Sequence, residues 1–228
     1  MCGRFTLIIS PEDLAAHFHI EGPIDFLTRY NIAPTQTIPA IVKEPETGFH
    51  VMTLFHWGLI PPWAEDPKIA NRLINARSET VSVRPAFRSA FKHRRCLIPT
   101  TGFFEWKREQ RKKQPYLIQI HDTTLFAFAG LWEKWTNQDG EVIESCTILT
   151  TPSNELISEI HNRMPVIVRP EHYDLWLDTQ TPKETLESLF QPFPAEGMIV
   201  CEVSNLVNSS KCDRPECIEP MKQKLVKA

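Results

Sequence analysis

The first residues of the chain could do covalent chemistry without a cofactor. The sequence begins Met1-Cys2-Gly3-Arg4-Phe5, and the small size of Cys2 favours removal of Met1. Removal would leave an α-amine and a thiol on one residue, with ordinary pKa values of about 8 and about 8.5, so both are partly deprotonated near neutral pH. The amine can form a Schiff base with an aldehyde, and the adjacent thiolate can then close a thiazolidine ring. Alternatively, Cys2 is an ordinary small residue near a chain end.

Three later stretches carry further candidate groups. Glu105 lies between aromatic residues in Gly102-Phe103-Phe104-Glu105-Trp106-Lys107, where desolvation would raise its pKa and make it an acid or base, unless it faces solvent from an alternating strand. His161 could move protons, or could only complement the C-terminal dipole of a helix. Asn75 and Arg77 alternate on one extended face and could present an amide and a guanidinium to a phosphate or a sugar.

The elements that must position these groups are short. Ser10-Pro11-Glu12-Asp13 predicts a helix start, and Thr151-Pro152-Ser153 predicts a second one running to Ile160, with His161 at its C-terminal end. Similar signatures occur at Arg169-Pro170-Glu171 and Thr181-Pro182-Lys183. Strands are predicted at 38–42, 51–59, 96–99, 103–107, 116–120, 125–132, 142–150, 166–168 and 198–203, before a polar tail.

These elements, cut short by 19 prolines, predict an α+β fold. We expect a single domain over residues 1–228, with a curved, mostly antiparallel, barrel-like sheet core flanked by short helices. No repeat or linker divides the chain.

Composition narrows the function classes. A formal net charge of −3 argues against a protein that coats nucleic acid indiscriminately, although ten Lys and Arg between Arg84 and Lys113 allow a local basic face. Within that stretch, residues 107–113 are typical of a solvated hairpin tip. No apolar run is long enough for a membrane span and no signal peptide is evident, so we expect a cytoplasmic protein with reduced cysteines and no membrane partner. Cys212 and Cys217 lack a matched metal-ligand spacing, so no metal is expected.

Six spaced blocks together resemble one family. They are Met1-Cys2-Gly3-Arg4-Phe5, Arg29-Tyr30-Asn31-Ile32-Ala33-Pro34, Trp57-Gly58, Asn75-Ala76-Arg77-Ser78-Glu79-Thr80, Gly102-Phe103-Phe104-Glu105-Trp106-Lys107 and His161-Asn162-Arg163-Met164-Pro165. The chain is similar in these blocks to the SRAP (SOS-response-associated peptidase) family, whose members cross-link to abasic sites in single-stranded DNA. The resemblance implies a cofactor-free, monomeric protein with a groove for such DNA leading to Cys2.

The resemblance also implies roles for individual residues. Cys2 would be the cross-linking nucleophile, Asn75 would hold the sugar, Glu105 would relay protons, and His161 would assist ring opening and later reversal. The implied DNA-binding residues are Arg4, Asn31, Pro34, Trp63, Arg77 and Arg163, with the three arginines on phosphates. Trp63 is followed by Ala64 rather than a second aromatic, so stacking beside the lesion is the least supported of these roles.

Two other functions use the same residues. The N-terminal Cys-Gly also resembles amidohydrolases and thiol peptidases of the N-terminal nucleophile class, but their downstream substrate blocks are not found. A non-covalent single-stranded DNA-binding module would use the arginines and Trp63 alone. A peptidase activity could amount to self-removal of Met1, or a host aminopeptidase could do it.

Overall fold

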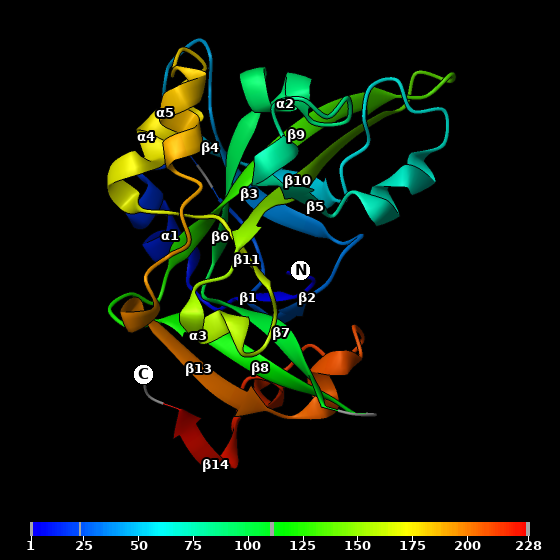
Figure 1. Cartoon of the computed structure of the whole chain (residues 1–228). Helices are drawn as coiled ribbons and strands as arrows, with labels where there is room; N and C mark the ends of the chain where they lie inside the picture. The colour runs from blue at the N-terminus through cyan, green and yellow to red at the C-terminus, as the bar shows by residue number, and fades with distance from the viewer. Residues whose placement is uncertain (1, 23, 110–111, 227–228) are drawn as a thin grey trace.

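Two curved β-sheets share one hydrophobic core in the computed structural model, which describes residues 2–22, 24–109 and 112–226 (Figure 1). The first sheet has the order β14 (Pro220–Val226), β13 (Met198–Val203), β8 (Lys112–Ile120), β7 (Gly102–Glu109), β1 (Phe5–Leu7), β2 (Arg29–Ile32). The second has the order β11 (Arg163–Pro165), β10 (Val142–Pro152), β4 (His50–Trp57), β3 (Thr37–Lys43), β6 (Arg95–Thr100), β9 (Phe126–Thr136), β12 (Ile167–Val168), with β5 (Asn75–Arg77) also paired to β10.

The second sheet closes on itself. Strand β10 pairs with β9 as well as with β4, which completes a five-stranded barrel of β10, β4, β3, β6 and β9. Among the described pairings between strands, only those of β10 with β4 and with β5 are parallel, and an isolated bridge between Ile20 and His50 is parallel as well. The predicted α+β fold with a mostly antiparallel, barrel-like core is therefore confirmed. The predicted hairpin is β7–β8, paired as far as Glu109 and Lys112, and residues 110–111 of its tip lie outside the described residues.

The helices are short, as expected from the prolines. The α-helices are α1 (Pro11–Phe18), α2 (Arg88–His93), α3 (Glu155–Ser158), α4 (Tyr173–Leu177) and α5 (Lys183–Ser188), and the 3-10 helices are η1 (Pro67–Arg72), η2 (Ser78–Thr80), η3 (Pro170–His172), η4 (Ala195–Gly197), η5 (Asn205–Asn208) and η6 (Pro215–Cys217). Ser10 caps α1 by accepting the amide N–H of Asp13 at 3.1 Å, as predicted. Within the described residues, no helix is long and apolar enough to cross a membrane.

Aromatic contacts join the two sheets beside the N-terminus. The ring of Phe5 on β1 lies 5.2 Å from that of Trp57 and 6.0 Å from that of Phe128, both on barrel strands. Phe103 on β7 contacts the same Phe128 at 5.8 Å. All four side chains are fully buried. Edge-to-face aromatic packing therefore fixes the position of β1, three residues after Cys2, against the barrel.

The predicted helix ahead of His161 is shorter than expected. Thr151 and Pro152 belong to the end of β10, where Thr151 pairs with Met164 of β11. The N-cap is Asn154, whose side chain accepts the amide N–H of Ile157 at 2.9 Å, and α3 ends at Ser158. The prediction of a cap at 151–153 and a helix to Ile160 was wrong because ladder pairing with β11 extends β10 through the proline.

The C-terminal region is not a polar tail. Residues 204–217, which we call the C-terminal clamp, form η5 and η6 and dock on β2 before β14 completes the sheet (orange in Figure 1). Buried Asn31 donates to the backbone carbonyls of Val207, Ser209 and Cys212 at 3.2, 2.9 and 2.7 Å. Asp213 accepts the backbone N–H groups of Tyr30 and Asn31. The polar residues of this segment satisfy the edge of β2, which composition alone does not reveal.

Asn31→Ala is expected to lower the free energy of unfolding by about 2 kcal/mol, because the carbonyls of Val207, Ser209 and Cys212 each lose one of their donors and Arg4 loses the Asn31 acceptor in a largely desolvated site. Urea unfolding of the variant and the wild type would measure the change. Asn71→Ala, at an exposed position in η1, is the matched control and should leave stability within experimental error. Equal stability of the two variants would show that the clamp is not held through Asn31.

Candidate active site beside Cys2

Cys2 lies three residues before the first residue of β1 and is fully buried, with 0% of its surface exposed. Its Sγ is 3.8 Å from the carbonyl oxygen of Arg4. Burial raises the pKa of the Cys2 thiol well above its ordinary value, and the negative charge of Glu105 raises it further. In this environment the resting thiol stays protonated, so a nearby base or positive charge is needed to make a thiolate.

Asn75 reaches Cys2 from a different part of the chain. Its position follows from Trp57, whose indole N–H donates to the Ile74 carbonyl at 2.9 Å, and from β5–β10 pairing, which sets Asn75 opposite Ile148. The side-chain Nδ2 of Asn75 donates to the carbonyl oxygen of Cys2 at 2.8 Å. Its Oδ1 is buried and has no hydrogen-bond partner among the described residues. The amide thus orients Cys2 and keeps one acceptor available for a ligand hydroxyl or amine.

Glu105 is brought beside Cys2 by the pairing of β1 with β7. The backbone N–H of Phe104 donates to the Arg4 carbonyl at 2.9 Å, so Glu105 lies next to the start of β1. Alternation along β7 sends Phe104 into a separate apolar cluster with Val207. Glu105 is 2% exposed, and burial raises the pKa of its carboxyl to about 7. The prediction that the Glu105 carboxyl is desolvated is confirmed, and the alternative of a solvent-facing side chain is excluded.

Burial of Glu105 predicts a pH-dependent stability. The folded chain favours the neutral form of the Glu105 carboxyl. The free energy of unfolding is therefore highest below the ordinary pKa of 4.5, and it falls as the pH rises toward about 7. The full loss is on the order of 3 kcal/mol. Glu105→Gln is therefore expected to remove this loss when urea unfolding at pH 5 is compared with unfolding at pH 8. Glu65→Gln, at an exposed position, should leave the wild-type pH dependence intact, and the prediction fails if both variants behave alike.

His161 follows α3 by three residues rather than ending it. Its Nδ1 lies 3.0 Å from the backbone nitrogen of Arg163 and 3.3 Å from the Arg163 carbonyl oxygen, so the backbone of Arg163 orients the ring. Burial lowers the pKa of His161, so the imidazole is neutral near pH 7. A role as a charged partner of the helix dipole is therefore not supported.

The predicted DNA-binding residues fall into two groups. Arg77 and Trp63 are exposed, with 59% of Trp63 accessible, and Pro34 is half-buried. Arg4 and Asn31 instead hold the C-terminal clamp: Arg4 Nη1 donates to Asn31 Oδ1 at 2.9 Å and to the carbonyl of Val207 at 2.6 Å. Contact of these residues with DNA stays a prediction, and for Arg4 and Asn31 it would compete with these internal hydrogen bonds.

Arg163 belongs to neither group. Its guanidinium donates to both carboxylate oxygens of Glu79 and to Thr150, and its side chain is 11% exposed. The hydrogen bond from Arg163 lowers the pKa of Glu79. Glu79 was part of a sequence block but had no predicted role. No local sequence pattern signals this pairing, because Arg163 follows Glu79 by 84 positions.

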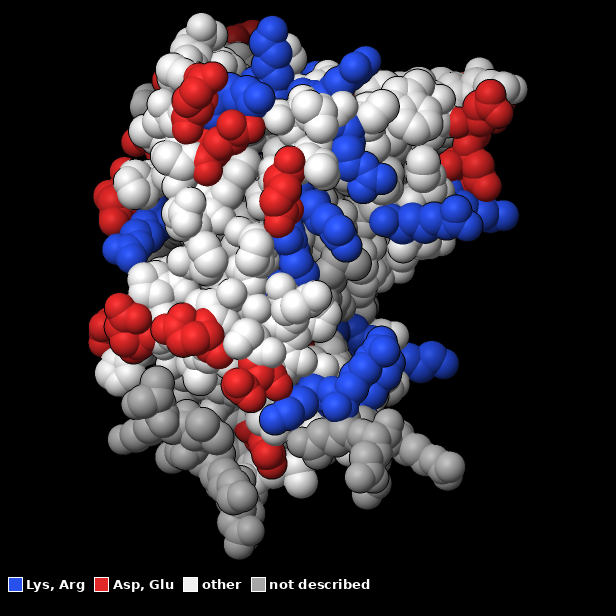
Figure 2. Space-filling view, viewed as in Figure 1, with Lys and Arg blue, Asp and Glu red and all other residues white. Residues whose placement is uncertain are grey.

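The surface around this site carries positive charge. Figure 2 shows Lys and Arg side chains on both sides of a hollow at the right of the view, level with the N-terminal end in Figure 1. Acidic side chains gather mainly on the opposite side of the same view. A net charge of −3 thus conceals a basic surface of the kind that nucleic acids bind.

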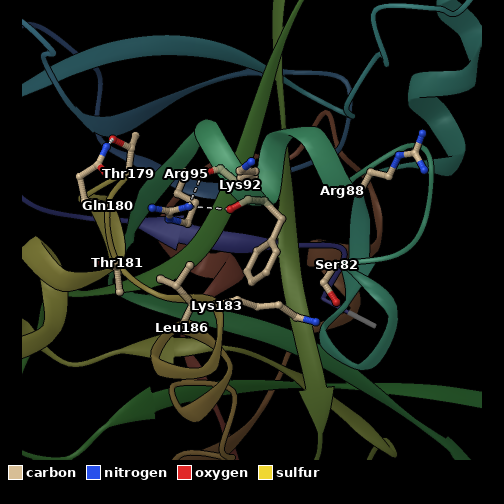
Figure 3. A pocket seen from close by; sticks show the side chains of 10 residues that line it. Ser82, Arg88, Lys92, Arg95, Thr179, Gln180, Thr181, Lys183 and Leu186 are labelled. Carbon is tan, nitrogen blue, oxygen red and sulfur yellow. Dashed lines mark hydrogen bonds between the residues drawn. The ribbon is translucent and has the colours of Figure 1, made fainter.

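A cavity of about 420 Å³ next to α2 and α5 contains none of the predicted site residues (Figure 3). Arg88, Lys92 and Lys183 line it. Its innermost cation, Arg95, donates to the carbonyls of Phe91, Lys92, Trp176 and Asp178. Because these bonds occupy the guanidinium at the C-terminal ends of α2 and α4, Arg95 has a structural role. Across the described part of the chain, no group of three or more His, Cys, Asp or Glu could hold a metal ion.

Comparisons with known proteins identify the family of the chain. The family model described as SOS response associated peptidase (SRAP) matches residues 1–210. The chain is 44% identical over 224 residues to the abasic site processing protein YoqW of Bacillus subtilis, covering 96% of this chain and 99% of that one. It is 30% identical to the abasic site processing protein HMCES of Xenopus tropicalis, covering 96% and 78%. A crystal structure of a Bacteroides thetaiotaomicron protein superposes with a TM-score of 0.88 at 28% identity, covering 96% and 100%. The chain therefore belongs to the SRAP family.

Proposed function

We propose that this protein captures abasic sites in single-stranded DNA covalently through Cys2 once Met1 has been removed. The observation that carries the proposal is the convergence of Asn75 and Glu105 on Cys2 from separate strands, together with the names of the relatives as abasic site processing proteins. Removal of Met1, by the chain itself or by an aminopeptidase, converts the backbone nitrogen of Cys2 into the required α-amine.

The reaction would proceed in two bond-forming steps. The Cys2 amine adds to the aldehyde carbon of the ring-opened sugar, and loss of one water gives a Schiff base. A base then takes the proton of the Cys2 thiol, the thiolate adds to the same carbon of the protonated Schiff base, and a thiazolidine with a neutral nitrogen results. The positive charge of the protonated Schiff base favours the thiolate that burial otherwise disfavours.

Neighbouring residues would move the protons. With a pKa of about 7, Glu105 can both accept and donate a proton near neutral pH, which suits a relay between thiol, carbinolamine and amine. His161, whose ring is neutral, would assist opening of the sugar ring. Asn75 would hold the sugar or the amine through Oδ1 while Nδ2 orients the Cys2 carbonyl.

Intact mass spectrometry under denaturing conditions tests the proposal. We expect a protein–DNA adduct after incubation with an oligonucleotide that contains one abasic site, and none with the undamaged oligonucleotide. Binding without an adduct would favour the non-covalent module. Hydrolysis of carboxamide or peptide substrates without an adduct would favour an N-terminal nucleophile hydrolase.

Arg77 is the exposed cation that we expect to contact a phosphate. Arg77→Glu should weaken single-stranded DNA binding to a similar extent for all sequences and reduce the log-log salt slope by roughly 0.7. Fluorescence anisotropy across a salt series measures both quantities. The control is Lys43→Glu, at the end of β3 that pairs with His50. If Arg77→Glu and Lys43→Glu show the same affinity and slope, Arg77 does not belong to the site.

A further inference from the structure

Two thiols meet in the C-terminal clamp. The Sγ atoms of Cys212 and Cys217 lie 3.4 Å apart, and Cys217 Sγ also lies 3.4 Å from the Cys212 carbonyl oxygen. A disulfide requires an S–S distance of about 2.05 Å, so a relative shift of about 1.4 Å would close it. The pair lies beyond residues 1–210, which the family model matches. It takes no part in the chemistry proposed for Cys2.

We propose that Cys212 and Cys217 form a dithiol that hydroperoxides oxidise to an intramolecular disulfide. The Cys212 thiolate attacks the peroxide oxygen, which gives a sulfenic acid and, after protonation of the leaving oxygen, one water. The Cys217 sulfur then attacks the Cys212 sulfur, the S–O bond breaks, and a second water leaves. In total, two thiols and one hydrogen peroxide give one disulfide and two waters. The two electrons pass from sulfur to the peroxide.

The solvent exposure of the two thiols indicates which of them reacts with the peroxide first. Cys212 is half-buried and accessible to a small oxidant, whereas Cys217 is fully buried among Phe104, Val203 and Val207. Burial raises the pKa of Cys217, and Cys212 and Asp213 raise it further. Cys212 is therefore the attacking thiol and Cys217 the resolving one.

The remaining cysteines are less suited to this reaction. Cys2, Cys96 and Cys146 are fully buried, and burial raises the pKa of each thiol. Cys201 is half-buried and has no second thiol within hydrogen-bonding distance among the described residues. Without a partner thiol, peroxide would oxidise Cys201 to oxygenated products, the sulfenic acid first, rather than to an intramolecular disulfide. Cys201 is thus a natural control within the same chain.

The disulfide would lock the segment that holds β2 and Arg4. Between the two cysteines, Asp213 binds the backbone N–H groups of Tyr30 and Asn31 and pairs with Arg29. The Cys212 carbonyl accepts from Asn31, and the Val207 carbonyl accepts from Arg4, two residues after Cys2. Cross-linking should restrict opening of the clamp and stabilise the strand next to Cys2 without altering Cys2 itself.

Mass spectrometry of the full chain treated with one equivalent of hydrogen peroxide tests the inference. We expect loss of two hydrogens, a Cys212–Cys217 linked peptide, and full reversal by dithiothreitol. Cys201→Ser should behave like the wild type, whereas Cys217→Ser should gain one oxygen on Cys212 and form no link. The same link should form in Cys2→Ser, which separates this result from the fate of the proposed abasic-site capture. The oxidised wild type should melt higher by roughly 4–8 °C.

Three results would overturn the proposal that Cys212 and Cys217 form a disulfide. The first is a linkage between other cysteines, and the second is oxidation of Cys201 or Cys2 before Cys212. The third is an oxidised form that melts below the reduced one, which would mean that the disulfide strains the clamp rather than locking it.

Discussion

Cys2→Ser is expected to abolish the denaturation-stable adduct with an abasic oligonucleotide while leaving a Schiff base that borohydride can trap. The variant keeps the α-amine after removal of Met1 but loses the sulfur that closes the ring. An imine hydrolyses when the unfolded protein no longer shields it, whereas a thiazolidine persists. Denaturing gels with and without borohydride, quantified against the wild type, measure both products.

Acetylating the mature N-terminus removes the other reactive group of Cys2, its α-amine. The thiol that remains gives only a labile hemithioacetal, so both the stable adduct and the borohydride-trapped product should disappear. Cys201→Ser, which changes a cysteine away from Cys2, serves as the control and should cross-link like the wild type. A stable unreduced adduct from either altered protein would show that ring closure is not the mechanism.

Glu105→Gln and His161→Ala should slow adduct formation or reversal by on the order of 10²- to 10⁴-fold, the range for loss of a positioned proton-transfer group. The final adduct should keep its mass, because neither side chain bonds to the sugar. Single-turnover kinetics with excess protein would give the rates, and intact mass would give the product.

The pH dependence distinguishes a proton relay from a purely structural role. Wild-type capture should follow the ionisation of a group with a pKa near 7, and this inflection should be absent in Glu105→Gln. A slowed variant that keeps the wild-type inflection would point to distorted packing around Cys2. An adduct of altered mass would mean that one of the two residues reacts with the sugar.

Much of this site follows from local sequence patterns. Alternation in Gly102–Lys107 predicted a strand with Glu105 between aromatics, and the structure shows that strand with its carboxyl buried. The cap at Ser10 and the strand at Met198–Val203 were also predictable, because caps and β-branched runs act over a few residues. The convergence of Asn75 and Glu105 on Cys2 was implied by the family resemblance rather than by spacing.

Long-range polar contacts were not predictable. Nothing near Arg4 or Asn31 in the sequence signals that both hold a segment more than 170 residues away. The polar composition of residues 204–217 suggested a solvated tail, but Asp213 and the carbonyls of that segment satisfy the edge of β2. The early end of α3 has a similar cause, since pairing with β11 overrides the signal of Pro152. In each of these regions, hydrogen bonds to distant parts of the chain determine the structure.

The most direct test of the mechanism is to locate the bonds in the adduct itself. After digestion of the unreduced cross-link, the sugar should reside on the peptide that begins with Cys2, and its mass should equal peptide plus sugar minus one water. That peptide should resist both borohydride and thiol alkylation, because a thiazolidine has neither a C=N bond nor a free thiol. An adduct on a lysine such as Lys107, or one in which the Cys2 thiol can still be alkylated, would contradict capture through the amine and thiol together.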